Sequence, residues 1–244
     1  DYRSFKAGPR GRYYMQMGFP WLFSIDSKGW CGDESIWPMQ LVEGKRDKIL
    51  LEFLKKEMVD KNISKFAQPN EKVKLPEKYI LFCCQLPHDM TIRYHSNTTV
   101  DKALIQTMDF AHSIDTPVVA KGHPINPGSM IELRSVFESR KRPGDMWVDT
   151  ASIHHCLAGC EAMFSVNSGG TGLDAILHEK PIFVFGRVDY QCIAHTFDIN
   201  IEETWKEKSK FIDKYSDFIY SYYINRYNVN SPESFDELNN EALR

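Results

Sequence analysis

Residues 162–185 read AMFSVNSGGTGLDAILHEKPIFVF, and this stretch decides the fold. The apolar run at 162–166 is typical of a buried strand, and it leads into a glycine-rich turn. The pattern from Gly172 to His178 predicts a helix, and a second apolar strand follows at 181–185. A strand, a glycine-rich turn, a helix and a strand in this order predict a βαβ unit of a parallel sheet.

The same alternation of short apolar runs and amphipathic stretches begins near residue 79. Strands are expected at 79–85, 117–121 and 146–148, and helices are expected near Thr99, Met130 and Ser152. At least two complete βαβ units are therefore present. The sequence predicts an α/β protein with a mostly parallel, Rossmann-type sheet.

The sequence patterns divide the chain into three regions. Residues 76–200 carry the alternation of strands and helices and are predicted to form the Rossmann-like lobe. Residues 1–75 are less regular, with a charged amphipathic helix around 45–61, and are assigned to a reduced second lobe. Residues 201–244 repeat aromatic and aliphatic side chains at helical spacing. They are expected to form C-terminal helices that pack across the lobes.

The composition is that of a soluble globular protein, because 42% of the 244 residues are hydrophobic and 26% are charged. A net charge of -3 offers no global attraction to nucleic acid, so no nucleic-acid partner is expected. The longest apolar runs are too short to span a bilayer. The six cysteines lack disulfide-type spacing, which favours the cytoplasm. The start at Asp1, without Met or a signal peptide, suggests a trimmed chain or one domain of a longer protein.

The glycine-rich turn is suited to bind an anion, because small residues let the backbone approach closely and a helix N-terminus presents unpaired N–H groups. Its members are Asn167, Ser168, Gly169, Gly170 and Thr171. The alternative is a tight connection that needs glycine for positive φ. A tight connection does not require so many small or hydroxylated residues in succession, and the anion site is therefore favoured. The turn is neither a Walker A loop nor a GxGxxG fingerprint.

Other polar residues are expected near this turn. Lys121 and His123 follow one strand, and His88 and Asp89 follow another, so all should reach the carboxyl edge of the sheet. His123 is suited to a phosphate contact or proton transfer, with a structural role equally open. For Asp89 the residues alone favour an Asx turn beside a proline over a role as nucleophile or base. Asp174 is placed to accept from a ribose, or simply to match the helix dipole.

Four residues expected on one short helix are of the types that bind zinc, namely His154, His155, Cys156 and Cys160. Zinc sites of this type need a second pair of ligands at defined spacing, and the sequence offers none. An apolar helix face also holds cysteines readily. No metal or other cofactor is therefore expected.

With these residues identified, the chain resembles the bacterial capsule polysaccharide biosynthesis glycosyltransferases, in particular the retaining β-Kdo transferases that use CMP-Kdo. The matching stretches are 23–29 (FSIDSKG), 85–96 with its Gln-x-x-x-Asp-x-x-Ile core, 121–124 (KGHP), 167–175 (NSGGTGLDA), the Lys-Pro at 180–181, Gly186 and Tyr190. They occur in order over most of the chain. The resemblance implies a two-lobed, GT-B-type fold whose donor lobe is the Rossmann-like region.

The resemblance also implies a reaction and a set of roles. Asp89 is the implied nucleophile of a double displacement that transfers Kdo with retention during assembly of capsule or lipopolysaccharide. Phosphate contacts are implied for Lys121, His123 and Ser168, and a ribose contact for Asp174. Sugar contacts are implied for Gln85, His88, Arg93, Arg187 and Tyr190. With protein cations and N–H groups in these roles, no metal is required.

One departure from the family pattern lies near the start of the chain. Relatives tend to place a carboxylate where this chain has Gln16, and an amide cannot exchange a proton as Glu can. The expected partners are a nucleotide-sugar donor and a glycan or glycolipid acceptor, in the cytoplasm or peripheral at the inner membrane within a capsule-assembly complex. Two alternatives remain: a transferase for CMP-sialic acid or a UDP- or GDP-sugar, and a non-catalytic nucleotide- or sugar-binding module.

Overall fold

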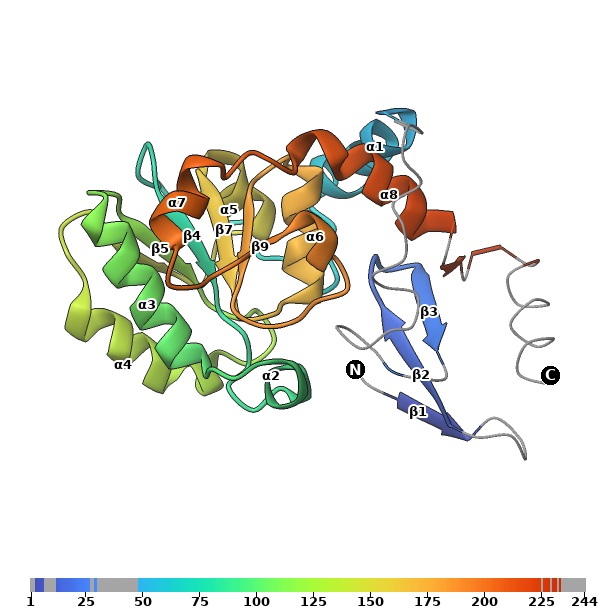
Figure 1. Ribbon diagram of the computed structural model, residues 1–244, viewed down its shortest axis with the longest axis horizontal. Helices are drawn as coiled ribbons and strands as arrows, with labels where there is room; N and C mark the ends of the chain where they lie inside the picture. Colours follow the sequence, from blue (N-terminus) through green and yellow to red (C-terminus); the bar gives the residue numbers. More distant parts are fainter. Residues whose placement is uncertain are drawn as a thin grey trace.

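The computed structural model describes residues 3–6, 12–26, 29, 48–224, 226–228, 230, 231 and 233 (Figure 1). Its central feature is a six-stranded sheet. The strands are β4 (Ile80–Cys83), β5 (Val118–Lys121), β6 (Met146–Val148), β7 (Ala162–Ser165), β8 (Ile182–Val184) and β9 (His195–Thr196). All five pairings between neighbours are parallel, which confirms the predicted α/β fold.

The strands lie in the order β6-β5-β4-β7-β8-β9. Counted from β4 as the first strand, this is the 3-2-1-4-5-6 order of the Rossmann fold. The order reverses between β4 and β7, where Ile80 pairs with Ala162 and Phe82 with Phe164. Ligands of such sheets bind beyond the carboxyl ends of the strands at this reversal.

Helices cover both faces of the sheet. The main helices are α1 (Lys48–Leu54), α2 (Met90–His95), α3 (Val100–Ser113), α4 (Ile131–Arg140), α5 (Ile153–Gly159), α6 (Gly169–Leu177), α7 (Ile201–Lys206) and α8 (Tyr215–Ile224). Shorter turns are η3 (Lys55–Asp60), η4 (Pro127–Met130), η5 (Gln191–Ile193) and η6 (Ile212–Lys214). Figure 1 shows α3 and α4 on one side of the sheet and α6 on the other, with α1 beside α8.

Burial on both faces explains why the strands are almost continuously apolar. In β4, Leu81 and Cys83 point into a core formed with α1, α5, α6 and α8. The alternate residues Ile80 and Phe82 point into a second core formed with α2, α3 and α4. The two cores are therefore separated by the sheet itself, as the period of two along a strand requires.

A second, antiparallel sheet has the order β1-β2-β3-β10. Its strands are β1 (Arg3–Lys6), β2 (Arg12–Met17), β3 (Leu22–Asp26) and β10 (Tyr227–Asn228). Strand β10 pairs with β3, so residues from both ends of the chain share one sheet. The sequence patterns had not indicated these strands.

The predicted boundary between residues 75 and 76 is not a break in packing. Leu54 of α1 and Met58 of η3 lie in the same core as Leu81 of β4. The C-terminal helix α8 joins this core through Phe218 and Tyr222 and packs against α1. Helices α1, η3 and α8 are thus built onto one face of the Rossmann-like sheet, whereas α7 packs on the other face through Ile201 and Trp205.

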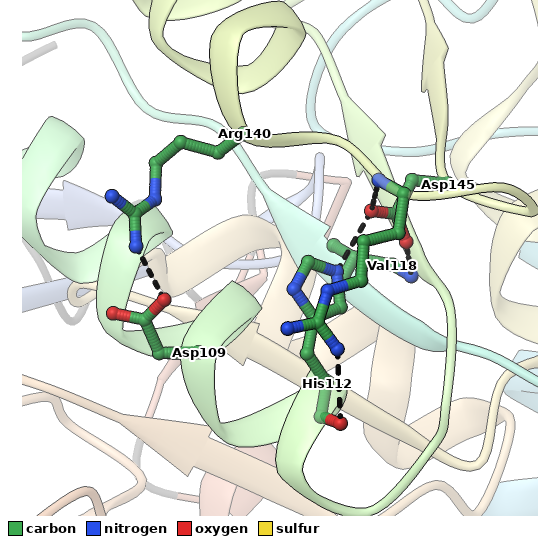
Figure 2. Close-up of polar contacts among 6 residues, drawn as sticks. Asp109, His112, Val118, Arg140 and Asp145 are labelled. Carbon is green, nitrogen blue, oxygen red and sulfur yellow. Dashed lines mark hydrogen bonds and ion pairs between the residues drawn. The ribbon is translucent and has the colours of Figure 1, made fainter.

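The buried carboxylate of Asp145 accepts hydrogen bonds that hold the amino end of β5 in place (Figure 2). Asp145 accepts hydrogen bonds from the backbone N–H of Val118 at 2.7 Å, from His112 Nε2 at 2.8 Å and from the N–H of Arg142 at 2.8 Å. The same figure shows Arg140 of α4 paired with Asp109 of α3. These contacts fix α3 and α4 to the sheet at the end opposite its carboxyl edge.

Candidate functional site

A cavity of about 240 Å³ lies at the carboxyl edge of the sheet. Its lining comes from residues within 64–68, 83–91, 121–125 and 167–171, together with Ile153. Three of these segments follow β4, β5 and β7, so the cavity lies at the strand-order reversal. Asp89, Lys121, His123 and the glycine-rich turn share this cleft, as predicted, whereas His88, which was predicted to lie there too, does not line it.

The glycine-rich turn is part of a helix. Helix α6 begins at Gly169, with Ser168 as its N-cap, rather than at Gly172 as the sequence suggested. The first N–H groups of the helix therefore belong to the residues that line the cavity. None of Gly169, Gly170 and Gly172 has positive φ. Among the glycines of the described residues, only Gly144 does. The competing explanation of a left-handed turn is wrong.

Close contacts explain two of the glycines instead. A Cβ on Gly172 would lie 2.1 Å from Cζ of Tyr190, and a Cβ on Gly170 would lie 3.3 Å from Cβ of Lys65. Tyr190 donates its hydroxyl hydrogen to the carbonyl oxygen of Ser168 at 2.6 Å. The glycines thus let two side chains lie directly against the first turn of α6.

A buried amide pair joins the ends of β4 and β7. The N–H of Asn167 donates to Gln85 Oε1 at 2.8 Å, and Gln85 Nε2 donates to Asn167 Oδ1 at 3.0 Å. Asn167 Nδ2 also donates to the carbonyl oxygen of Thr91 at 2.8 Å. The pair therefore fixes the glycine-rich turn relative to α2. Gln85 lines the cavity, as expected of a sugar contact, and Asn167 lines it as part of the turn.

Asp89 lines the same cavity and caps α2, a helix that the sequence patterns did not reveal. Its Oδ1 accepts from the N–H of Thr91 at 2.9 Å and from Thr91 Oγ1 at 2.8 Å. The expected local turn is therefore present. Because both bonds go to Oδ1, they leave Oδ2 of Asp89 out of the cap.

Lys121 and His123 contribute to the cavity from the end of β5. The Lys121 ammonium is buried and donates to the carbonyl oxygens of Gly122 at 3.0 Å and Asp149 at 3.4 Å. Burial lowers the pKa of His123, and the charge of Lys121 lowers it further, while Asp89 opposes both. His123 Nδ1 accepts from the N–H of Ile125 at 3.3 Å. A neutral imidazole of this tautomer carries its hydrogen on Nε2, which makes Nε2 a hydrogen-bond donor.

Two predicted contacts are corrected by the structure. Asp174 lies in the second turn of α6, is fully buried, and accepts from Ser64 Oγ at 2.7 Å. It lies outside the cavity lining, so the expected ribose contact is not supported. Tyr190 is also buried and supports Ser168 from behind rather than facing a sugar. Both side chains point to the core because α6 and its neighbours pack there.

Other expected contacts lie outside the cavity lining. His88 and Arg93 are exposed on the loop before α2 and on α2 itself. Arg187 donates its N–H to the carbonyl oxygen of His95 at 2.7 Å and so supports the end of α2. Gln16 belongs to β2, where it pairs with Ser24, but its side chain is outside the described residues.

The histidines considered as metal ligands hold the backbone instead. His154 Nε2 donates to the carbonyl oxygen of Ile63, and His155 Nε2 to that of Val73, each at 2.8 Å. His154 Nδ1 lies 3.1 Å from Nε2 of His178. These bonds fix the segment between η3 and β4 to the Rossmann-like sheet. Within the described residues, no group of three or more His, Cys, Asp or Glu side chains is placed to hold a metal.

This segment supplies the part of the site that sequence patterns missed. Ser64, Lys65, Phe66 and Gln68 all line the cavity, although their sequence looks like a polar linker. The Phe66 ring lies 5.4 Å from the His123 ring, centroid to centroid. No sequence signal separates these residues from an ordinary linker, because tertiary packing alone brings them to the cavity.

Fold and site together define an α/β protein with a nucleotide-binding type of sheet and a cavity at the strand-order reversal. The family model described as "Capsule polysaccharide biosynthesis protein" matches residues 43–232. The chain therefore belongs to the capsule polysaccharide biosynthesis protein family, as the sequence resemblance suggested.

Individual relatives agree with this family. The Escherichia coli "Capsule polysaccharide export protein KpsS" is 24% identical over 144 residues, which cover 56% of this chain and 37% of that protein. The Thermosulfurimonas dismutans KpsC β-Kdo 2,7 transferase superposes with a TM-score of 0.53 at 18% identity, over 76% of this chain and 61% of that one. The β-Kdo 2,4 transferase of the same KpsC gives 0.54 at 15% identity, over 84% and 70%. The chain thus spans little more than a third of KpsS. The two KpsC structures confirm the fold, including its Rossmann-type lobe.

Proposed function

We propose that the protein is a glycosyltransferase of capsule polysaccharide biosynthesis that transfers Kdo from CMP-Kdo with retention, through a covalent adduct on Asp89. The observation that carries the proposal is the shared cavity, where Asp89 faces the same space as the first turn of α6. Retaining transfer needs a nucleophile on one side of the anomeric carbon and a stabilised leaving group on the other.

The leaving-group end is formed by α6 and β5. The first N–H groups of α6 and the Ser168 hydroxyl are donors that suit a phosphate oxygen. His123, neutral and with its hydrogen on Nε2, adds a donor without adding charge. These groups would bind the CMP phosphate more strongly as its charge develops, which is how electrostatic catalysis lowers a barrier. No metal is required in this arrangement.

The nucleophilic end is Asp89. In the first step, Oδ2 attacks the anomeric carbon of Kdo, and the bond from that carbon to the phosphate oxygen breaks with its electron pair, releasing CMP. In the second step, an acceptor hydroxyl oxygen attacks the same carbon, the bond to Asp89 breaks, and the hydroxyl proton passes to a base or to water. Two inversions restore the starting stereochemistry. Thr91 holds the other oxygen throughout.

The acceptor is proposed to be a glycan or glycolipid, in keeping with the family. Among the described residues, no helix is long and apolar enough to cross a membrane. We propose that the reaction takes place in the cytoplasm or at the inner membrane surface. We also propose that the chain acts there together with other parts of a longer protein or complex.

Intact-protein mass spectrometry after incubation with CMP-Kdo tests the proposal. The wild-type chain should gain the mass of one Kdo residue, and peptide mapping should place it on Asp89. The variant Asp89→Asn keeps an oxygen that caps α2 but is a poor nucleophile, so it should fold, bind CMP and form no adduct. The matched control Asp101→Asn makes the same change on the exposed surface of α3 and should form the adduct normally.

Other donors are tested in the same experiment. An adduct with CMP-sialic acid or a UDP- or GDP-sugar, but not with CMP-Kdo, would replace the proposed donor. CMP release without any adduct on Asp89 would overturn the double displacement. Binding of CMP without turnover of any donor, in the presence of acceptor extracts, would favour a non-catalytic binding module.

A further inference from the structure

The segment 64–68 is anchored at both ends to helices that border the cavity. Ser64 Oγ donates to Asp174 Oδ2 of α6 at 2.7 Å. Gln68 Oε1 accepts from the N–H of Ile153, the first residue of α5, at 2.9 Å. Because its two ends are bonded to two helices, the residues between them have a defined position over the cavity.

Lys65 lies between these anchors and crosses the first turn of α6. A Cβ built on Gly170 would lie 3.3 Å from Cβ, 3.4 Å from Cδ and 4.0 Å from Cγ of Lys65. The aliphatic stem of Lys65 therefore runs along the helix end. Gly170 does not need positive φ, and a Cβ at this position would come into tight contact with Lys65, so the glycine leaves room for the lysine stem.

The ammonium of Lys65 belongs to the cavity. Nζ lies 5.6 Å from the ring centroid of Phe66, and Phe66 packs against His123. Lys65 and His123 both line the cavity, and the positive charge of Lys65 contributes to the lowered pKa of His123. The other cavity lysine, Lys121, has two of its N–H groups on backbone carbonyl oxygens.

We propose that Lys65 binds the phosphate of the nucleotide sugar and is a further catalytic residue, which stabilises the departing CMP. This inference rests on the proposed function. A cation at the N-terminus of α6 would add to the helix N–H groups, because both act on the same phosphate oxygens. Lysine suits this task because its ammonium is a mobile point charge with three donors.

Calorimetric titrations with CMP and with cytidine separate a phosphate contact from a general effect on the site. Lys65→Met keeps most of the stem over Gly170 and removes the charge. We expect it to weaken CMP binding about tenfold or more and to leave cytidine binding unchanged. Lys65→Arg should restore most of the CMP affinity. The control Lys61→Met removes a charge that pairs with Glu57 on the exposed surface, and should bind both ligands normally.

The salt dependence of CMP binding tests the ionic contact independently of how much CMP affinity the variant loses. CMP binding to the wild type should weaken with salt more steeply than CMP binding to Lys65→Met, since one ionic contact is missing from the variant. Equal CMP affinity of wild type and Lys65→Met would overturn the role of Lys65. An equal loss of cytidine and CMP would also overturn it, because that result would mean damage to the site. A wild-type chain that binds no CMP would instead refute the proposed function, and this inference with it.

Discussion

The correction at Asp174 leads to a quantitative prediction for the variant Asp174→Asn. Asp174 is fully buried in α6, and burial raises its pKa from the ordinary value of 3.8 to about 6, while His154 and Ser64 oppose the rise. Asparagine has nearly the same shape and keeps an oxygen that accepts from Ser64. The variant therefore removes the ionisation with little change in packing.

The sign follows from proton linkage. An acid whose pKa is higher in the folded state contributes stability that is fully present below pH 3.8 and is lost as the pH rises through about 6. The full loss corresponds to ~3 kcal/mol, and roughly 1.4 kcal/mol of it falls between pH 5 and pH 7.5. The amide of the variant does not ionise and has no such loss. The free energy of unfolding of the variant, relative to wild type, should therefore rise by roughly 1.4 kcal/mol between these two pH values.

This difference can be measured by urea unfolding at pH 5, 6, 6.8 and 7.5, followed by tryptophan fluorescence. Burial lowers the pKa of the neighbouring His178 to about 4, which destabilises the fold as the pH falls. Both proteins share that histidine, so its effect cancels in the comparison. Asp60→Asn makes the same change at an exposed position of η3 and should follow the wild type at every pH.

The reasoning would be refuted by a variant whose stability parallels the wild type within roughly 0.5 kcal/mol across this pH range, since the linkage argument would then have no buried carboxylate to act on. CMP affinity provides a second check. Because Asp174 lies outside the cavity lining, Asp174→Asn should bind CMP within about twofold of wild type. A loss of tenfold or more would restore the ribose contact that the sequence had suggested.

Three further substitutions test the fold and its connection to the site. Asp145→Ala leaves the buried N–H at the start of β5 without its acceptor and should cost about 2–4 kcal/mol in urea unfolding, with CMP affinity unchanged at the far edge of the sheet. Gly172→Ala forces a Cβ to 2.1 Å from Tyr190 and should cost about 1–3 kcal/mol while weakening CMP binding in calorimetry. Phe183→Ala removes a buried ring stacked at 4.6 Å on Phe164, and should cost about 3–5 kcal/mol by thermal or urea unfolding.

The parallel sheet could be predicted because its strands are buried on both faces and are therefore apolar throughout. The run at 162–166 and the pattern at 181–185 both lie in the observed β7 and β8 region. The short strand β9, His195–Thr196, gave no such signal, since it has two residues and a polar composition. The full strand order, and with it the strand-order reversal, therefore required the structure.

Helix α6 shows how tertiary packing overrides local preference. Glycine is a poor helix former, so the sequence suggested a helix that starts only at Gly172. The helix starts three residues earlier, and Lys65 and Tyr190 lie so close to its first turn that glycines fit there better than larger residues. Helix α2 was missed for a different reason. It is six residues long, and its capping residue, Asp89, is equally typical of a loop.

The site was predictable to the level of chain segments. The carboxyl ends of parallel strands meet at one edge, so Asp89, Lys121 and His123 could be placed together because each follows a predicted strand. The direction of each side chain could not, because it depends on where its helix begins and how it packs. Asp174 and Tyr190 both point away from the cavity for this reason.

The buried hydrogen bonds beside the cavity explain how Asp89 and the proposed phosphate-binding turn can act together. Gln85 and Asn167 bond to each other twice, and Asn167 bonds onward to the carbonyl oxygen of Thr91, the residue that holds Asp89. The proposed nucleophile and the helix end are thus joined by buried hydrogen bonds rather than by a flexible loop. Donors that are fixed before the ligand arrives need no reorganisation as charge develops. The amide pair therefore sets the distance between the two halves of the proposed reaction, although neither amide needs to touch the reacting atoms.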